Sequence, residues 1–226
     1  MIKIIKKFIK KVLFSNFTYK HFPFLYLFIK YSKLNVNSSE YWDNIHSQEI
    51  KNPTFRFDNL IKDIINRVDF NNKSVLDIGC GQGYFLTNIP EAKKRVGIDF
   101  SKKAIDNLIK KNIEGHVRTL PKINLWSKFD IISCFETLEH VKRWKQTIDQ
   151  AISHLEENGL LLISTPFEDS IQINEHVVYF DLSRIYNFLK KRISILEIKI
   201  VGPWMIVVAQ KSKQQEHEIP KYFLKK

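Results

Sequence analysis

Cysteine is scarce in this sequence, and that scarcity excludes the class of small secreted domains held together by disulfides. The 226 residues contain only Cys80 and Cys134, and two thiols cannot form a disulfide framework. With 44% hydrophobic residues, among them 17 phenylalanines, the chain can bury a core without one. We expect both cysteines to be small core or loop residues in a reducing cytosol.

Acidic residues are absent from the first 33 positions, which contain eight lysines. Apolar residues recur there at three- and four-residue spacing between Met1 and Leu13, which predicts a basic amphipathic helix. Such a helix is typical of a segment that lies on an anionic membrane surface. The pattern equally fits a helix that caps the domain and keeps its lysines in water. A membrane-surface contact through residues 1–30 is therefore one of two open interpretations.

Long apolar runs are also missing. The patch from Phe22 to Ile29 is interrupted by Pro23 and is too short to span a bilayer. No small-x-small cleavage site follows it, so a signal peptide is not expected. We expect a cytoplasmic protein, either free or held at the inner face of the membrane by its basic arm.

The formal charge of +12 is concentrated at the two ends of the chain. Eight of these charges lie in residues 1–33 and a net three in residues 210–226, which leaves about one for the residues between them. A nearly neutral body argues against a nucleic-acid groove, so no nucleic-acid partner is expected. We predict a basic extension over 1–35, a main domain over 36–211 and a basic tail over 212–226.

Apolar strands alternate with amphipathic helices through the main domain, which predicts an α/β fold with a parallel sheet and right-handed crossovers. The last two strands are joined by a short connection and should form an antiparallel hairpin. The expected architecture is a Rossmann-like, doubly wound, seven-stranded and mostly parallel sheet, with an N-terminal helical extension. The strands are expected at 74–78, 95–99, 116–120, 129–135, 160–165, 193–201 and 205–211, and the helices within 40–70 and at 104–109, 142–155 and 182–190.

Three glycines follow the first strand at every second position, namely Gly79, Gly81 and Gly83. Bare backbone after a strand can approach a ligand closely, and the next helix would point its N–H groups at the same place. A nicotinamide fingerprint would need one further glycine where Tyr84 stands. Asp99, at the end of the second strand, could accept hydrogen bonds from the ribose of an adenosine.

The stretch from Asp77 to Gly83 resembles motif I of the class I S-adenosylmethionine (SAM) methyltransferases, and Val96 to Ser101 resembles motif II. Phe129 to Val141 resembles the motif IV variant that ends in Leu-Glu-His-Val. The likeness covers roughly residues 40–210, although His116 stands where many relatives place an acid before Leu120-Pro121. It implies SAM as cofactor, bound by Asp77, Gly79, Cys80, Gly81, Gly83, Asp99, Phe100 and Phe135.

Four side chains near the expected methyl position carry further chemistry. Glu136, Glu139 and His140 have the i, i+3, i+4 spacing of one helical face, and His176 lies in a downstream Glu-His element. Together they could ligate Mg²⁺, Mn²⁺ or Zn²⁺, similar to metal-assisted 2′-O-methyltransferases of small RNA and ubiquinone-pathway O-methyltransferases. Alternatively His140 or His176 is a catalytic general base, or the group is purely structural.

The sequence thus predicts a SAM-dependent methyltransferase that acts on a hydroxyl. A hydroxyl needs help to lose its proton, and the imidazoles near the methyl site could give it. The acceptor would be a small molecule, a sugar or glycan, or a lipid-linked intermediate. An RNA methyltransferase is the alternative enzyme, although the Asn-Pro-Pro-Tyr signature of adenine N6 enzymes is missing after Phe135. A catalytically inactive partner protein with the same fold is the non-enzyme alternative. The oligomeric state is left undetermined.

Overall fold

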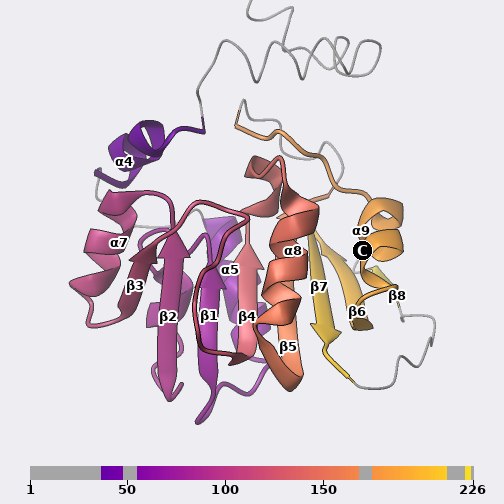
Figure 1. Ribbon diagram of the computed structural model, residues 1–226. Coiled ribbons are helices and arrows are strands. Elements are labelled where there is room, and N and C mark those ends of the chain that lie inside the picture. Colours follow the sequence, from indigo (N-terminus) through magenta and orange to yellow (C-terminus); the bar gives the residue numbers. More distant parts are fainter. Residues whose placement is uncertain (1–36, 48–54, 168–174, 213–221, 225–226) are drawn as a thin grey trace, which may run out of the picture.

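The computed structural model describes residues 37–47, 55–167, 175–212 and 222–224. One mixed sheet runs through the molecule in the order β3-β2-β1-β4-β5-β7-β6-β8 (Figure 1). The strands β1 to β5 are parallel, and β7 is antiparallel to both β5 and β6. Their bounds are β1 Ser74–Ile78, β2 Lys94–Asp99, β3 Glu114–Val117, β4 Phe129–Phe135, β5 Leu155–Pro166, β6 Ser194–Val201, β7 Trp204–Gln210 and β8 Tyr222–Leu224.

The predicted α/β sheet with its antiparallel C-terminal hairpin is confirmed, with differences at its edges. The strand β8 pairs in parallel with β6 and adds an eighth strand from the segment predicted as a basic tail. The strand β5 begins at Leu155, five residues before the expected start, because Leu155 pairs with Phe129 ahead of a bulge. The strand β3 ends at Val117, so its predicted extension to residue 120 is wrong.

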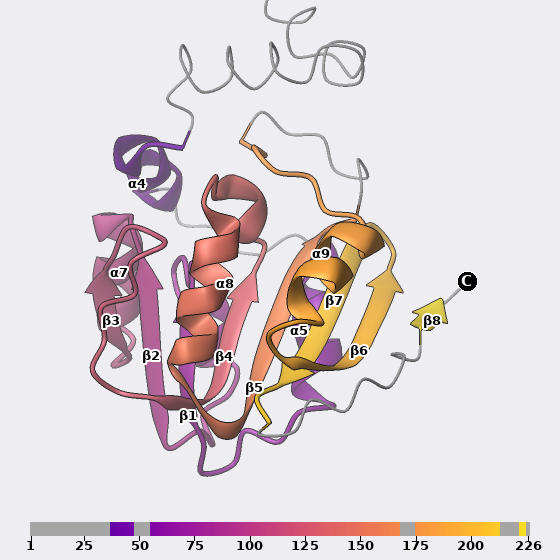
Figure 2. The ribbon, with the colours of Figure 1, turned by 45° about the vertical axis from the view of Figure 1, so that its right-hand side comes forward.

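Helices cover both faces of the sheet, as a doubly wound fold requires (Figure 2). Trp144 and Ile148 of α8 and Ile185 of α9 share one core cluster, whereas Ile64 of α5 and Leu108 of α7 belong to the other. Parallel strands buried on both faces explain the continuous apolar runs of β1 and β4. The helices are α4 Ser39–Ser47, α5 Phe55–Ile65, α6 Tyr84–Thr87, α7 Lys102–Ile109, α8 Trp144–Ser153 and α9 Leu182–Leu189, with a 3-10 turn η1 at Leu138–His140.

Local signals in the sequence account for several helix starts. Ser101 caps α7, since its hydroxyl accepts a hydrogen bond from the Ala104 N–H at 3.1 Å. Asp181 caps α9 in the same way through the Arg184 N–H at 2.6 Å. The predicted helical stretch 40–70 consists of two helices, α4 and α5.

The predicted amphipathic extension over residues 1–35 lies outside the described residues. Within the part of the chain that the structure describes, no helix is long and apolar enough to cross a membrane. The helix α4 lies beside α7, at the end of the sheet where β1, β2 and β4 finish (Figures 1 and 2). This end of the molecule contains the candidate site.

Candidate functional site

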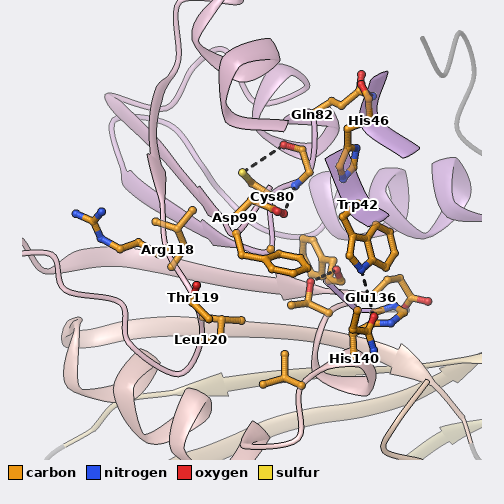
Figure 3. Close-up of a pocket in the computed structure, with 18 of the residues that line it drawn as sticks. Trp42, His46, Cys80, Gln82, Asp99, Arg118, Thr119, Leu120, Glu136 and His140 are labelled. Atoms are coloured by element: carbon orange, nitrogen blue, oxygen red, sulfur yellow. Dashed lines mark hydrogen bonds between the residues drawn. The ribbon is translucent and has the colours of Figure 1, made fainter. Parts of the chain in front are cut away.

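A cavity of about 700 Å³ lies at the carboxyl ends of β1, β2 and β4 (Figure 3). In the sheet order β1 stands between β2 and β4, so this is the point where the direction of strand progression reverses. Open α/β sheets bind their ligands in the crevice at such a switch point. The wall includes Gly79, Cys80 and Gly81 after β1, Asp99 and Phe100 after β2, and Phe135, Glu136, Thr137 and His140 after β4.

The glycine loop after β1 brings bare backbone to the cavity. Gly79 has a φ of +73°, and a Cβ there would lie 2.2 Å from the Thr137 Oγ1 atom, so any side chain at this position would strain the backbone and displace Thr137. The N–H groups of Gly79 and Cys80 both donate to the Ile98 carbonyl, at 2.8 and 3.1 Å, and fold the loop against β2. Gly83, with φ +78°, caps α6 and packs against Leu108.

The two strand-end acids occupy different positions. The Asp99 carboxylate lies at the cavity, where it accepts hydrogen bonds from the Gly81 N–H at 3.0 Å and the Ser101 N–H at 2.9 Å. Asp77 is buried and accepts a hydrogen bond from the Ser133 hydroxyl at 2.7 Å. Burial raises the pKa of Asp77 to about 7 and also raises the pKa of Asp99. Asp99 is thus placed to meet a ligand, and Asp77 supports the strand from which the loop starts.

Two further predicted cofactor residues, Cys80 and Phe135, lie at the cavity, and Cys134 and His116 lie elsewhere in the sheet. Cys80 and Cys134 are both buried free thiols, and burial raises the pKa of each well above its usual value. Phe135 lies at the cavity and meets Phe85 edge-on, with ring centroids 5.0 Å apart. His116, the departure from motif III, lies on the edge strand β3 with its Nε2 atom 2.9 Å from a carboxylate oxygen of Glu114.

Helix α4 contributes cavity residues that the sequence reasoning missed. Trp42 and His46, one helical turn apart, both line the cavity, and their rings stack with centroids 6.0 Å apart (Figure 3). The helix is held by Asp43, whose carboxylate accepts hydrogen bonds from the Ser101 hydroxyl at 2.5 Å and the Lys103 N–H at 3.0 Å. The available signal was an aromatic and a polar residue at i and i+4 on a short helix.

His46 lies beside the glycine loop after β1 and near the Asp99 carboxylate. Its backbone carbonyl accepts hydrogen bonds from the side-chain amides of Gln82, at 3.3 Å, and Asn107, at 3.1 Å. Burial lowers the pKa of its imidazole, although the nearby carboxylates of Asp99 and Asp43 act in the opposite direction. A neutral ring therefore covers the glycine loop at neutral pH.

Three of the four predicted metal ligands come together. One ligand atom from each of Glu139, His140 and His176 lies within 4.8 Å of the others. The Nδ1 atom of His140 is 3.1 Å from the Glu175 carbonyl oxygen, and its Nε2 atom is 3.9 Å from Glu139 Oε1. The imidazoles of His140 and His176 meet edge-on, with centroids 5.0 Å apart.

Glu136 is directed elsewhere. Its Oε1 atom accepts a hydrogen bond from the Ser164 hydroxyl at 2.9 Å, and its Oε2 atom accepts one from the Trp204 indole N–H at 2.7 Å. The expected common face with Glu139 and His140 does not form, because Glu136 has a φ of +47° and precedes the 3-10 turn η1. Burial raises the pKa of Glu136 to about 7.

Glu139 is a buried acid that faces an imidazole. Neither of its carboxylate oxygens accepts a hydrogen bond from the residues that the structure describes. Burial raises the pKa of this carboxyl well above its usual value, and the neighbouring Glu136 adds to the effect. A buried carboxyl of this kind is stable when it is protonated or when a cation lies beside it.

Comparison with known proteins identifies the family of this arrangement. Residues 54–198, more than half of the chain, match a family model described as a methyltransferase domain. The mitochondrial ubiquinone biosynthesis O-methyltransferase of Candida albicans is 27% identical over 176 residues, which cover 65% of this chain and 51% of that protein. The tRNA U34 carboxymethyltransferase of Campylobacter fetus subsp. fetus is 30% identical over 142 residues, covering 57% of this chain and 49% of that protein.

The chain thus spans about half the length of these curated relatives. Among solved structures, the N-methyltransferase NodS from Bradyrhizobium japonicum WM9, in complex with S-adenosyl-L-homocysteine, has the same fold with a TM-score of 0.62. The match is 16% identical and covers 75% of this chain and 98% of that one. The family match and the doubly wound sheet together show that the chain belongs to the methyltransferase-domain family of class I SAM-dependent methyltransferases.

Proposed function

We propose that this protein transfers the methyl group of SAM to a hydroxyl of a small molecule, a sugar or glycan, or a lipid-linked intermediate. The observation that carries the proposal is the orientation of His140 beside the cavity. Its Nδ1 atom faces the Glu175 carbonyl, so Nδ1 carries the proton of the neutral ring and Nε2 is its basic nitrogen. The name of the Candida albicans relative, a ubiquinone biosynthesis O-methyltransferase, supports a hydroxyl on a small molecule as acceptor.

The cavity fits the cofactor on its β1 and β2 sides. The backbone of Gly79 and Gly81 lines the cavity with no side chain of its own, and the Asp99 carboxylate has lone pairs for the two ribose hydroxyls. Phe100 and Leu120 supply apolar walls for the adenine. We assign cofactor contacts to these residues and to Cys80 and Phe135, with Asp77 and Gly83 supporting the loop.

Bound SAM would supply a methyl carbon that its sulfonium activates for attack by the acceptor oxygen. The chain's own residues align the acceptor and exclude water, and helix α4 covers the cavity with Trp42 and His46. The acceptor proton passes to Nε2 of His140, with His176 beside that ring. A neutral imidazole is well suited to this role near pH 7.

A divalent cation at Glu139, His140 and His176 is the second arrangement for the same reaction. The buried Glu139 carboxyl, which accepts no hydrogen bond from the described residues, favours it. The donor set of one carboxylate and two imidazoles suits Zn²⁺ or Mn²⁺. Such a cation would lower the pKa of an acceptor hydroxyl. Glu136 is left out of this set, because Ser164 and Trp204 engage both of its oxygens.

The test is SAM turnover by the full chain against a panel of acceptors, namely a catechol, a phosphorylated sugar and unmodified tRNA. We expect methyl transfer to a hydroxyl acceptor, identified by mass spectrometry, and a loss of roughly 100-fold in rate for His140→Gln. His116→Gln, a histidine on the edge strand outside the cavity wall, is the matched control. Transfer to tRNA alone would replace this proposal with the RNA methyltransferase. Absence of SAM binding by calorimetry would favour the inactive partner protein.

The same assay distinguishes the metal from the base. If the cation is required, chelation with EDTA abolishes the rate, and Glu139→Gln weakens binding of Zn²⁺ or Mn²⁺ in calorimetry. An unchanged rate in protein that elemental analysis shows to be metal-free would eliminate the cation and leave His140 as the base. The predicted contact of residues 1–30 with a membrane surface remains part of the proposal, since a surface-bound enzyme would suit a lipid-linked acceptor.

A further inference from the structure

The orientation of His140 depends on a backbone carbonyl that is far away in the sequence. A carbonyl oxygen only accepts hydrogen bonds, so the Nδ1 atom that faces Glu175 carries the ring proton. The Nε2 atom is then the unprotonated nitrogen of the neutral ring, and it faces Glu139. Any group that fixes the Glu175 carbonyl therefore determines which nitrogen of His140 can accept a proton or ligate a cation.

Asn37, which precedes helix α4, holds that carbonyl in place. Its Nδ2 atom donates to the Glu175 oxygen at 2.7 Å, across 138 positions of sequence. The orientation of the amide is itself fixed, because its Oδ1 atom accepts a hydrogen bond from the Trp42 indole N–H at 3.2 Å. An indole N–H can only donate, so the amide oxygen faces Trp42 and the amide nitrogen faces Glu175.

Two more contacts from α4 reinforce this arrangement. The Tyr41 hydroxyl donates a hydrogen bond to the Glu175 carboxylate. The Trp42 ring lies edge-on to the His140 ring, with centroids 5.2 Å apart and planes at 78°. Glu175 is thus held by Asn37 and Tyr41, and two residues later the Val177 N–H donates to the Glu139 carbonyl at 2.7 Å.

We propose that Asn37 and Trp42 are positioning residues for the methyl transfer, holding the Glu175 carbonyl so that His140 keeps its proton on Nδ1 and has Nε2, on the side of Glu139, as its basic nitrogen. The inference rests on the proposed function in one respect, namely that Nε2 of His140 is the nitrogen that accepts the acceptor's proton. Helix α4 then joins two halves of the site. Its Asp43 and His46 contact the cofactor side, and its Tyr41 contacts the histidine side together with Asn37, which precedes the helix.

The decisive measurement is the tautomer of His140, read from long-range ¹H–¹⁵N correlation spectra of the full chain. The His140 signals are assigned by their loss in His140→Gln. We expect the Nδ1–H tautomer alone in the wild type, and a mixture of the two tautomers in Asn37→Leu, which has a similar volume but no donor. The matched control is Asn107→Leu. Its amide also donates to a backbone carbonyl of the α4 segment, but to that of His46 instead of Glu175.

Rates and binding complete the test. We expect the methyl-transfer rate of Asn37→Leu to fall roughly 10- to 100-fold through misplacement of the base. Its dissociation constant for SAM should stay within about twofold of the wild-type value. Trp42→Phe keeps an aromatic ring but removes the indole donor, and should shift the tautomer in the same direction to a smaller extent. This variant keeps the inference testable if Asn37→Leu does not fold.

A single Nδ1–H tautomer in both folded variants would overturn the inference, as would an equal mixture in Asn107→Leu. The spectra need no acceptor. An enzyme that transfers no methyl group but shows the expected tautomers would therefore refute the proposed function alone.

Discussion

At the scale of single residues, Gly79 is the position where backbone conformation and packing act together. We expect Gly79→Ala to raise the dissociation constant for SAM at least roughly tenfold, because an alanine there takes a left-handed conformation that costs about 1–2 kcal/mol and its Cβ also meets the Thr137 side chain. Calorimetric titration with SAM checks this expectation.

Gly202→Ala separates these two effects. Gly202 also has a positive φ, +57°, but none of the described residues has an atom within 4 Å of the point that an alanine Cβ would occupy, so only the conformational cost applies. We expect this variant to unfold at a lower temperature and still bind SAM normally. Equal loss of SAM binding in both variants would show that the contact with Thr137 is unimportant.

The sequence predicted which residues lie at the site better than it predicted where their side chains point. Gly79, Gly81 and Asp99 lie at the cavity because spacing after a strand determines where backbone and side chain can go. Glu136 could not be placed in this way, since its left-handed backbone conformation turns it away from the helical face that its spacing suggested. Its partners Ser164 and Trp204 come from other strands, and one-dimensional spacing contains no information about them.

At the scale of elements, α4 is held to the domain through the N-terminus of α7. The Asp43 carboxylate receives the Ser101 hydroxyl and the Lys103 N–H, and the hydrogen bond from Ser101 lowers the pKa of Asp43. We expect Asp43→Ala to cost about 1 kcal/mol, the usual value of a capping carboxylate. The loosened helix should weaken SAM binding roughly fivefold, because His46 and Trp42 move with it.

Glu40→Ala is the control for that variant, since Glu40 is an exposed acid in the first turn of the same helix. Titration calorimetry with SAM gives the affinities, and chemical denaturation gives the free energies of unfolding. If Asp43→Ala and Glu40→Ala bind SAM equally well, α4 does not contribute to the cofactor site.

The elements themselves were predictable where their signal is local. Buried strands are visible as apolar runs, and the cap of α7 as a serine before an amphipathic stretch. The docking of α4 was not predictable, because none of its residues is fully buried and its contacts reach residues far along the chain. The strand β8 escaped prediction for a similar reason, since three residues are too few to show a period.

At the scale of the whole molecule, four buried carboxyls with raised pKa values, those of Asp77, Asp99, Glu136 and Glu139, make stability depend on pH. Burial raises the pKa of Asp77 and that of Glu136 to about 7 each, whereas such groups titrate near pH 4 in an unfolded chain. Between about pH 4 and pH 7 the folded state therefore binds more protons than the unfolded state. The free energy of unfolding should fall as the pH rises through this window, by up to about 4 kcal/mol for each fully titrated group.

Asp77→Asn tests this whole-molecule effect at one of its sources. The asparagine keeps an oxygen that can accept the hydrogen bond from Ser133 but has no charge to bury, so the variant should lose less stability between pH 5 and pH 8 than the wild type does. Urea unfolding at both pH values measures it, with Asp106→Asn on the solvent-facing side of α7 as the control. Because Asp77 lies beneath the cofactor loop, SAM binding by the variant should change far less than its pH dependence of stability. A wild-type protein that grows more stable from pH 5 to pH 8 would show that other groups outweigh these buried carboxyls.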